Sequence, residues 1–294
     1  MNPLLYLTNQ RIKEFVFQSL QSSYTRRGIA TEVVEGIVDV LATCRENPET
    51  AVHRVYEQVI DMRPLGCFGE KYNSYKRWER PQFLYALMKE YLIGTTVVDV
   101  GCGDNSFCKY LVTNVNQNLL CIGTDVLCYP DCYHGSHVDF RLQEPPLQIP
   151  VNTHEANCVM FANVLHHIKH EDLNSIVREV IRITSPERNV IVIIEDTWDD
   201  KSKPVWEGKD LNTLLFRLTP EERCRAMAII DWIGTDLATG HLAMSKPFAF
   251  KSMETWEQFF LKHGFQIIGS RYLGFPPQKL HLNPQGLLVL RKKP

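Results

Sequence analysis

The chain has 294 residues, of which 44% are hydrophobic and 22% are charged, as in a globular protein with a sizeable core. Its net charge of −2 argues against nucleic acid or an anionic membrane as a partner. No apolar run reaches the ~18 residues of a membrane-spanning helix, and the N-terminal "MNPLLYLTNQ" is a poor secretion signal. We therefore expect a cytoplasmic protein of one large domain, or of one domain with an extension.

The first part of the chain is predicted to be helical, because three sets of apolar residues recur there at helical spacing. These sets are Ile12, Phe15 and Leu20; Val34, Ile37 and Leu41; and Val52, Val55 and Val59. Asn47 and Pro48 favour a helix start before the third set. A further helix is expected from about Pro81. We assign residues 1–85 to a helical N-terminal extension.

From Thr95 the pattern changes to short β-branched runs that alternate with helical stretches. The predicted strands include "TTVVDV", "LLCIGTDV", "NCVMFANV" and "NVIVIIED", and this alternation favours right-handed βαβ units with a parallel sheet. Residues 199–250 interrupt it with a helical insertion, in which the capping box "TPEE" at Thr219–Glu222 predicts a helix start. Two final strands, "FQIIGSRYL" and "LLVLRKK", are placed to pair antiparallel. Residues 86–294 are thus predicted to form a doubly wound, mostly parallel α/β sheet with a C-terminal hairpin.

Nine cysteines are scattered irregularly along the chain, which favours reduced thiols over a disulfide framework. In "CYPDCYH", Cys128, Cys132 and His134 stand close enough to suggest a metal site. A closed zinc site needs further ligands, however, and no second pair stands out. We interpret the stretch as a loop and expect no metal.

The stretch "VVDVGCGDNSF" places a glycine turn at the carboxyl end of a predicted strand, where open parallel sheets bind ligands. Gly101 and Gly103 allow a ligand to approach the backbone closely. The spacing differs from the dinucleotide fingerprint, because Ser106 stands where its third glycine would be. A carboxylate such as Asp99 suits a cation or an amine rather than a pyrophosphate.

These residues resemble the class I S-adenosylmethionine-dependent methyltransferases, in particular the branch that acts on small molecules. "VVDVGCGDN" follows the first motif of that family except that Asn105 replaces the last glycine, and asparagine tolerates positive φ. "CIGTDV" supplies the acid at the end of the next strand, "HVDFRL" offers one for the strand after it, and "NVLHHI" matches the end of the fourth. The resemblance covers about residues 85–292 and implies a Rossmann-like, seven-stranded methyltransferase fold.

The resemblance also implies roles for individual residues in binding S-adenosylmethionine. Asp125 would accept the two ribose hydroxyls, Asp139 would contact the adenine amine, and Asp99 would lie near the amino-acid end of the cofactor. The segment "YNSYKRWER" would fold over the cofactor with Arg80 near its carboxylate, unless it is only an amphipathic connector. The implied cofactor-binding residues are Arg80, Asp99, Gly101, Cys102, Gly103, Asn105, Asp125, Val126, Asp139, Phe140 and Asn163.

His166 and His167 are the candidate catalytic residues, because a histidine facing the methyl group can deprotonate a hydroxyl or amine near neutral pH. Alternatively, one of them packs under the fourth strand and the other caps the following helix. Glu195 and Asp196, at the end of the fifth strand, are rival bases, unless they only form a solvated strand end.

The predicted activity is methyl transfer from S-adenosylmethionine to an oxygen or nitrogen of a small, partly apolar or aromatic metabolite. Residues 1–85 and 199–250 would form the acceptor pocket. "FANV" differs from the Asn-Pro-Pro-Tyr motif used on nucleobase amines, which again argues against nucleic acid. Three alternatives stay open: a protein or peptide acceptor, a cofactor-binding scaffold without catalysis, and, by fold analogy, a nicotinamide-dependent oxidoreductase. The sequence leaves the oligomeric state open.

Overall fold

The computed structural model describes residues 2–25, 28–44, 48–60, 74–187, 189–206, 209–237, 246–276 and 283–293. The chain divides into two compact units. The helical unit comprises Met1–Asn73, Thr197–Lys251 and Leu273–Gln285, and the sheet unit comprises Ser74–Asp196, Ser252–Tyr272 and Gly286–Pro294. Asn47, expected to begin a helix, and Tyr72 of "YNSYKRWER" lie outside the described residues.

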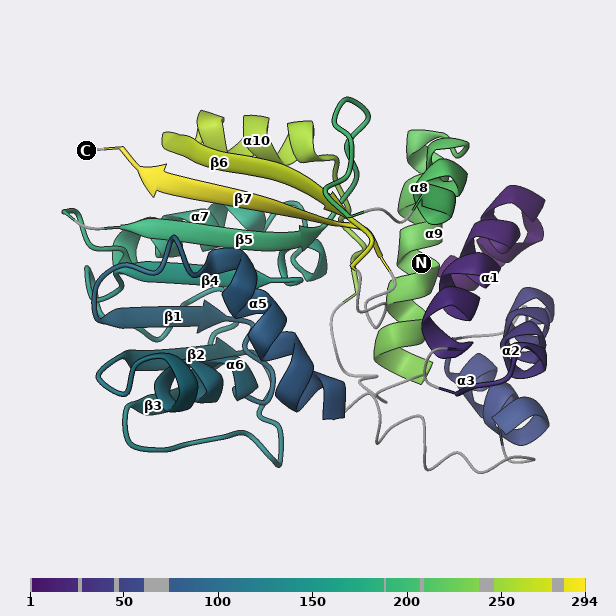
Figure 1. Ribbon diagram of the computed structural model, residues 1–294, viewed down its shortest axis with the longest axis horizontal. Helices are drawn as coiled ribbons and strands as arrows, with labels where there is room; N and C mark the ends of the chain where they lie inside the picture. The colour runs from purple at the N-terminus through teal and green to yellow at the C-terminus, as the bar shows by residue number, and fades with distance from the viewer. Residues whose placement is uncertain are drawn as a thin grey trace. The chain divides into compact units, whose positions relative to one another are not determined.

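The sheet unit contains a seven-stranded sheet in the order β3-β2-β1-β4-β5-β7-β6 (Figure 1). In chain order the strands are β1 (Thr96–Val100), β2 (Leu120–Asp125), β3 (Val138–Leu142), β4 (Cys158–Ala162), β5 (Val190–Asp196), β6 (Phe265–Gly274) and β7 (Gln285–Lys292). Strands β1 to β5 pair in parallel, and β6 and β7 run antiparallel as a hairpin at one edge. The doubly wound α/β fold predicted from the sequence is confirmed.

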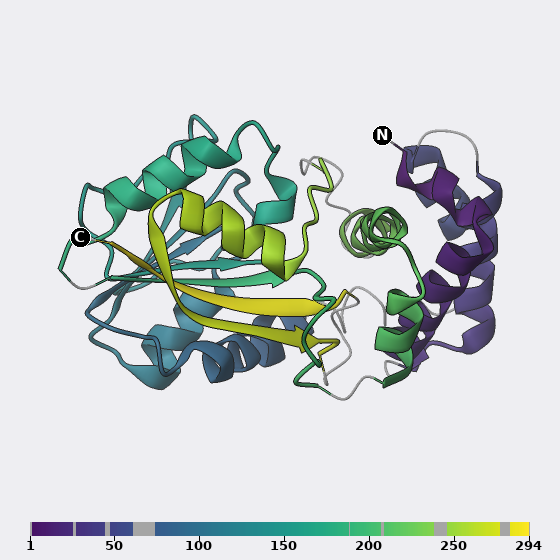
Figure 2. The ribbon, with the colours of Figure 1, turned by 90° about the horizontal axis from the view of Figure 1, so that it is seen from above.

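Helices cover both faces of this sheet, with α5 and α6 on one face and α7 and α10 on the other (Figure 2). The helices of the sheet unit are η4 (Tyr75–Glu79), α5 (Arg80–Met88), α6 (Ser106–Tyr110), η5 (Leu111–Val115), η6 (Leu165–His167), α7 (Leu173–Ile183) and α10 (Met253–Lys262). Every residue of β4 and β5 is buried, because central strands of a parallel sheet are covered on both faces. On α7 the buried residues follow one helical stripe; they are Leu173, Ile176, Val177, Val180 and Ile183.

The direction of strand order reverses between β1 and β4. From β1 the chain proceeds outward through β2 to β3, then returns to β4 on the other side of β1. The carboxyl ends of β1 and β4 therefore diverge into loops on opposite sides, which is where doubly wound sheets bind ligands. The register aligns Val100 of β1 with Thr124 of β2 and Phe161 of β4, so the three strands end at one edge.

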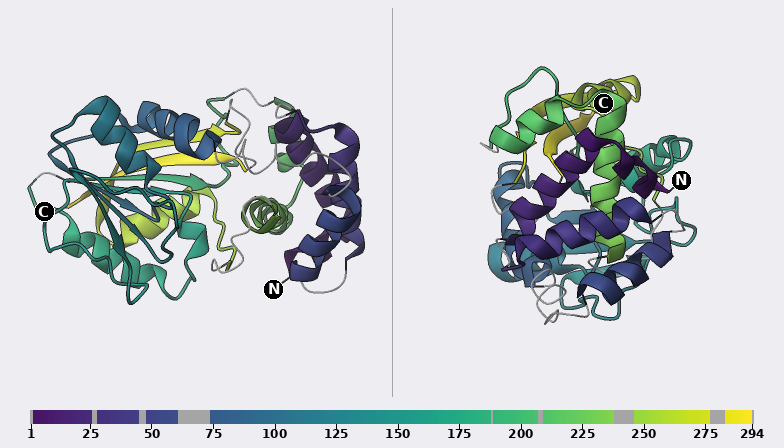
Figure 3. Two further views of the ribbon diagram at one scale, coloured as in Figure 1. Left: turned by 90° about the horizontal axis from the view of Figure 1, so that it is seen from below. Right: turned by 90° about the vertical axis from the view of Figure 1, so that its right-hand side faces the viewer.

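The helical unit combines helices from the N-terminal third of the chain with helices from the inserted segment. They are η1 (Pro3–Thr8), α1 (Gln10–Tyr24), α2 (Thr31–Thr43), α3 (Pro48–Val55), η3 (Tyr56–Ile60), α8 (Lys209–Phe216), α9 (Pro220–Trp232) and η7 (Ile233–Leu237). Helix α1 packs against both α2 and α9 (Figure 3). None of the helices described is long and apolar enough to cross a lipid bilayer.

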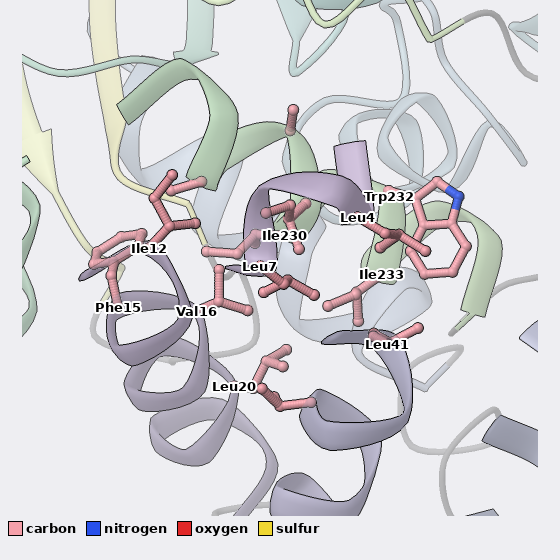
Figure 4. Packing of buried hydrophobic residues seen from close by; sticks show 14 of the residues in the cluster. Leu4, Leu7, Ile12, Phe15, Val16, Leu20, Leu41, Ile230, Trp232 and Ile233 are labelled. Atoms are coloured by element: carbon pink, nitrogen blue, oxygen red, sulfur yellow. The ribbon is translucent and has the colours of Figure 1, made fainter. Parts of the chain in front are cut away.

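An apolar core holds these helices together. Side chains from η1, α1, α2 and α9 converge on it (Figure 4). Each buried leucine or isoleucine contributes about 1.5–3 kcal/mol; the fully buried members include Leu4, Leu7, Ile12, Leu20, Leu41, Ile230 and Ile233. Thr219 and Glu222 form the predicted capping box at the start of α9. Glu222 also accepts hydrogen bonds from Asn9 at 2.9 Å and Arg11 at 2.7 Å, which joins α9 to the start of α1.

The division into units differs from the expected boundary at residues 85 and 86. Helix α5 belongs to the sheet unit, where it packs against α6; its buried residues include Phe83 and Leu84. The inserted segment 199–250 instead groups with the N-terminal helices, since α9 shares its core with α1.

Candidate functional site

The loop after β1 has the conformation that its glycines predict. Gly101, Gly103 and Asn105 all have positive φ, of 76°, 58° and 63°, a region that residues other than glycine and asparagine seldom adopt. A Cβ atom on Gly101 would lie 2.4 Å from a methyl carbon of Val164. The amide of Gly101 donates to the carbonyl of Thr124 at 2.7 Å, so the loop folds closely over the end of β2.

Asp125, the last residue of β2, binds this loop directly. One carboxylate oxygen accepts the amide of Gly103 at 2.9 Å, and the other accepts the amide of Leu127 at 3.0 Å. The structure thus brings the expected ribose-binding acid to the glycine loop.

Asp99 lies inside β1 with only 3% of its surface exposed, and within the described part of the chain no hydrogen bond reaches its carboxyl group. Burial raises the pKa of Asp99 to about 7; the charge of Arg80 opposes this shift, and the charges of Asp125 and Asp104 add to it. A buried carboxyl group is costly unless a donor satisfies it. The site therefore suits a ligand that brings an amine or another hydrogen-bond donor to Asp99.

Arg80, at the start of α5, reaches the carboxyl end of β4. Its guanidinium donates to the carbonyl of Ala162 at 3.0 Å and contacts the side-chain oxygen of Asn163 at 3.5 Å. Because its charge also acts on Asp99, a cation and an acid stand together beside the glycine loop. A guanidinium has five donor protons, so Arg80 retains the capacity to bind a ligand carboxylate.

Cys102, one of the implied cofactor-binding residues, is packed between the two glycines of the loop. Its thiol is buried and donates to the carbonyl of Gly103 at 3.7 Å, and burial raises its pKa strongly. Cys128, Cys132 and His134 lie in the loop between β2 and β3. Burial raises the pKa of the Cys132 thiol to about 12, so this thiol is unreactive near neutral pH.

The placement expected for Asp139 is wrong. It was expected after the third strand, but it is the second residue of β3, aligned with Ile122 in the middle of β2. Its half-exposed carboxylate is bound to Arg141 at 2.7 Å. Phe140 follows within the strand, and its ring packs edge-on against His134 at 5.8 Å. Pairing with β2 carries strand β3 to Leu142, three residues beyond Asp139.

The residues at the true carboxyl end of β3 were missed by the sequence analysis. Leu142 is aligned with Asp125 and is 36% exposed, and the neighbouring Val126, which was predicted, is 46% exposed. Two apolar side chains thus border the acid, and such a surface suits an aromatic ring. Gln143 follows; its amide donates to the carbonyl of Asp125 at 2.8 Å, and its side chain donates to Thr124 at 2.8 Å. The alignment of the end of β3 with Asp125, at the end of β2, identifies Leu142 and Gln143 as residues of this edge.

His166 is buried in the packed interior, with 1% of its surface exposed, and its Nδ1 is hydrogen-bonded to the carboxylate of Glu195. Glu195 also accepts the amides of Leu165 at 2.6 Å and Val164 at 3.2 Å. This arrangement supports the packing interpretation of His166. His167 is half-buried with its ring centroid 4.1 Å from that of His166, and its catalytic role stays a prediction.

The alternative of a solvated strand end for Glu195 and Asp196 is wrong, because both side chains are only 2% exposed. Asp196 accepts a hydrogen bond from the side-chain amide of Asn163. The backbone amide of Asn163 donates to the carbonyl of Ile194 at 2.8 Å. Asn163 has a φ of 61°. The two carboxylates therefore hold the loop after β4 in place, and neither stands as a solvated base.

Residues 98–192 match the family model described as a methyltransferase domain. No curated protein matches the chain in a sequence search. Among solved structures, a Burkholderia thailandensis 1,6-didemethyltoxoflavin-N1-methyltransferase is 11% identical, with 83% of this chain and 89% of that one covered and a TM-score of 0.48. An Aquifex aeolicus SAM-dependent methyltransferase is 15% identical (76% and 97% covered, TM-score 0.45). A Haemonchus contortus phosphoethanolamine N-methyltransferase 2 is 11% identical (74% and 53% covered, TM-score 0.49).

Proposed function

Because the chain contains a class I S-adenosylmethionine-dependent methyltransferase domain, we propose that it methylates an oxygen or nitrogen atom of a small, partly apolar metabolite. The observation that carries the cofactor assignment is the buried carboxyl group of Asp99 beside the positive-φ loop Gly101–Asn105. This loop is bound in turn to Asp125. The methyltransferase domain rests on the family model that residues 98–192 match; the acceptor is the proposal.

The residues at the sheet edge fit the chemical groups of S-adenosylmethionine. Asp99 would accept from its ammonium group and Arg80 would bind its carboxylate, since each is the oppositely charged partner. Asp125 would accept from the ribose hydroxyls. Val126 and Leu142, both partly exposed at the ends of neighbouring strands, would border the adenine ring.

When bound, S-adenosylmethionine supplies a methyl carbon that its sulfonium makes electrophilic. The protein's own work is to align the acceptor with that carbon, exclude water and, where the acceptor needs it, hold the departing proton. His167, which is half-buried just after β4, is the proposed proton acceptor, because imidazole is a common general base near neutral pH.

The chemistry of the acceptor is inferred from charge. With a net charge of −2 the protein lacks the general attraction for polyanions that nucleic-acid enzymes show. A small metabolite is therefore favoured as the partner. Methylation of a protein or peptide is the second candidate, and binding of the cofactor without catalysis is the third.

The test is label transfer from methyl-labelled S-adenosylmethionine in an extract of the source cells, followed by separation of the products by size. We expect label in the low-mass fraction, and less of it with the variant Asp125→Asn. Label on protein or nucleic acid would contradict the metabolite proposal. Binding of the cofactor product by the wild-type chain with no label in any fraction would instead support the scaffold.

A further inference from the structure

Asn105 stands where the family motif has glycine, yet its side chain makes contacts that glycine cannot make. The residue is completely buried. Its side-chain amide donates to the carbonyl of Tyr133 at 3.0 Å and to the carbonyl of Asp139 at 3.2 Å. Tyr133 lies in the loop between β2 and β3, and Asp139 lies in β3, so one amide group bridges the glycine loop to two later segments.

Two further contacts hold the bridge made by Asn105, one to the loop between β2 and β3 and one to strand β2. The amide of Tyr133 donates to the carbonyl of Asp104 at 3.0 Å, which makes the connection between the two loops reciprocal. The side-chain oxygen of Asn105 lies against Gly123 of β2, where a Cβ atom would approach it to 2.2 Å. The asparagine is therefore held between the sheet and the segment that follows β2.

We propose that Asn105 is a positioning residue that locks the glycine loop to the segments carrying the adenosine side of the cofactor site. The inference rests on the S-adenosylmethionine site described above. Asp99 and Arg80 lie beside the loop and suit the amino-acid group, whereas Val126 and Leu142 end the strands on the adenosine side. A ligand that contacts both sides gains affinity when their relative geometry is fixed before binding.

A simpler role is tolerance of the left-handed backbone, since asparagine adopts a φ of 63° more readily than most residues. The two roles predict opposite results for Asn105→Gly. Glycine adopts positive φ at no steric cost, so the backbone role predicts unchanged or improved cofactor binding. The positioning role predicts weaker binding, because the two hydrogen bonds to Tyr133 and Asp139 are lost.

The experiment is calorimetric titration of the full chain with two probes. S-adenosylhomocysteine spans both sides of the site, and 5′-methylthioadenosine has the adenosine group without the amino-acid group. For Asn105→Gly we expect a loss of affinity of about tenfold for S-adenosylhomocysteine and of about twofold or less for 5′-methylthioadenosine. An overall loosening of the fold would weaken both probes equally.

The matched control is His154→Gly. His154 also has positive φ, 63°, and its ring nitrogen is 3.1 Å from a backbone carbonyl, that of Thr184. It precedes β4 and therefore lies at the opposite edge of the sheet from the site. We expect His154→Gly to bind both probes like the wild type.

Equal affinity of Asn105→Gly and wild type for S-adenosylhomocysteine, or equal losses for the two probes, would overturn the proposal. If Asn105→Gly does not fold, Asn105→Asp keeps the side-chain shape without the donor and is expected to show the same unequal losses. Failure of both variants to fold would mean a purely structural requirement and would also overturn it. A wild-type chain that binds neither probe would overturn the cofactor assignment itself.

Discussion

The backbone amide of Gly103 donates to a carboxylate oxygen of Asp125 at 2.9 Å, although the two residues are 22 positions apart. The bond joins the loop after β1 to the last residue of β2. Asp125 therefore orients the loop directly, at the sheet edge where the cofactor is proposed to bind. Changes to either partner are therefore expected to alter cofactor binding.

The variant Asp125→Asn is expected to lower the affinity for S-adenosylhomocysteine about 10-fold to 100-fold, since a charge-assisted acceptor contributes about 1.5–3 kcal/mol. The matched control is Asp139→Asn, because that carboxylate is half-exposed and bound to Arg141. We expect its affinity to change less than about twofold. Calorimetry measures both. An Asp139→Asn loss as large as that of Asp125→Asn would restore Asp139 to the cofactor site.

Cofactor binding is expected to depend on pH through Asp99. Burial raises the pKa of this group to about 7, and an ammonium ligand prefers the carboxylate that forms above that pH. Affinity for S-adenosylhomocysteine should therefore rise between pH 6 and pH 8, by up to about tenfold per unit below the pKa. A calorimetric series of the wild type against Asp99→Asn measures this; the variant should bind weakly with a flat profile. A flat wild-type profile would contradict the assignment.

The raised pKa of Asp99 also affects folding stability, which is expected to fall as the pH rises, whereas cofactor affinity is expected to increase. Between the unfolded pKa near 4 and the folded pKa near 7, the folded protein holds a proton that the unfolded chain releases. The contribution of Asp99 to stability is therefore complete below about pH 4 and is lost as the pH rises through 7. We expect Asp99→Asn to melt at a higher temperature than the wild type at pH 8 without ligand. An unchanged or lower melting temperature there would count against burial as the cause.

Three glycine-to-alanine variants distinguish two causes of lost stability, namely backbone strain at positive φ and steric contact of the added Cβ atom. Gly101 has positive φ and a Cβ clash with Val164, Gly264 has positive φ with nothing near, and Gly234 has neither. The expected losses of unfolding free energy are about 2 kcal/mol or more for Gly101→Ala and about 1 kcal/mol for Gly264→Ala. Gly234→Ala is expected to be neutral or stabilising by up to about 1 kcal/mol. Denaturant titration ranks the three, and any other order would contradict the loop geometry.

Glu195→Gln is expected to destabilise the protein by about 3 kcal/mol or more, because it replaces a buried carboxyl group that is bound to His166 and to the amides of Val164 and Leu165. The control is Glu171→Gln at an exposed position, where the change should stay within about 0.5 kcal/mol. Thermal melting followed by circular dichroism compares them. Equal melting temperatures would mean that Glu195 does not hold the loop after β4.

The local structures that were predicted correctly from the sequence depend on neighbouring residues. The glycine turn after Asp99 and the strand that ends at Asp125 are visible in short stretches, because turn chemistry and strand periodicity are local. The same holds for the capping box at Thr219, which lies within one helical turn.

The errors lie where distant pairing decides the outcome. The end of β3 is set by its register with β2. The prediction from sequence relied on the short apolar run alone, so it expected Asp139 after the strand and missed Leu142. The hydrogen-bond partners of Glu195 lie about thirty residues earlier in the chain. They cannot be recognised from the local sequence, so a solvated strand end was considered for Glu195. The bridge made by Asn105 is equally invisible in sequence, since its acceptors lie 28 and 34 positions away.

The most direct test of the cofactor site is calorimetric titration of the full chain with S-adenosylhomocysteine and, separately, with NAD⁺. We predict one-site binding of S-adenosylhomocysteine that Asp125→Asn weakens, and no binding of NAD⁺. Binding of NAD⁺ without binding of S-adenosylhomocysteine would contradict the assignment of Asp99, Asp125 and the glycine loop, and would favour an oxidoreductase.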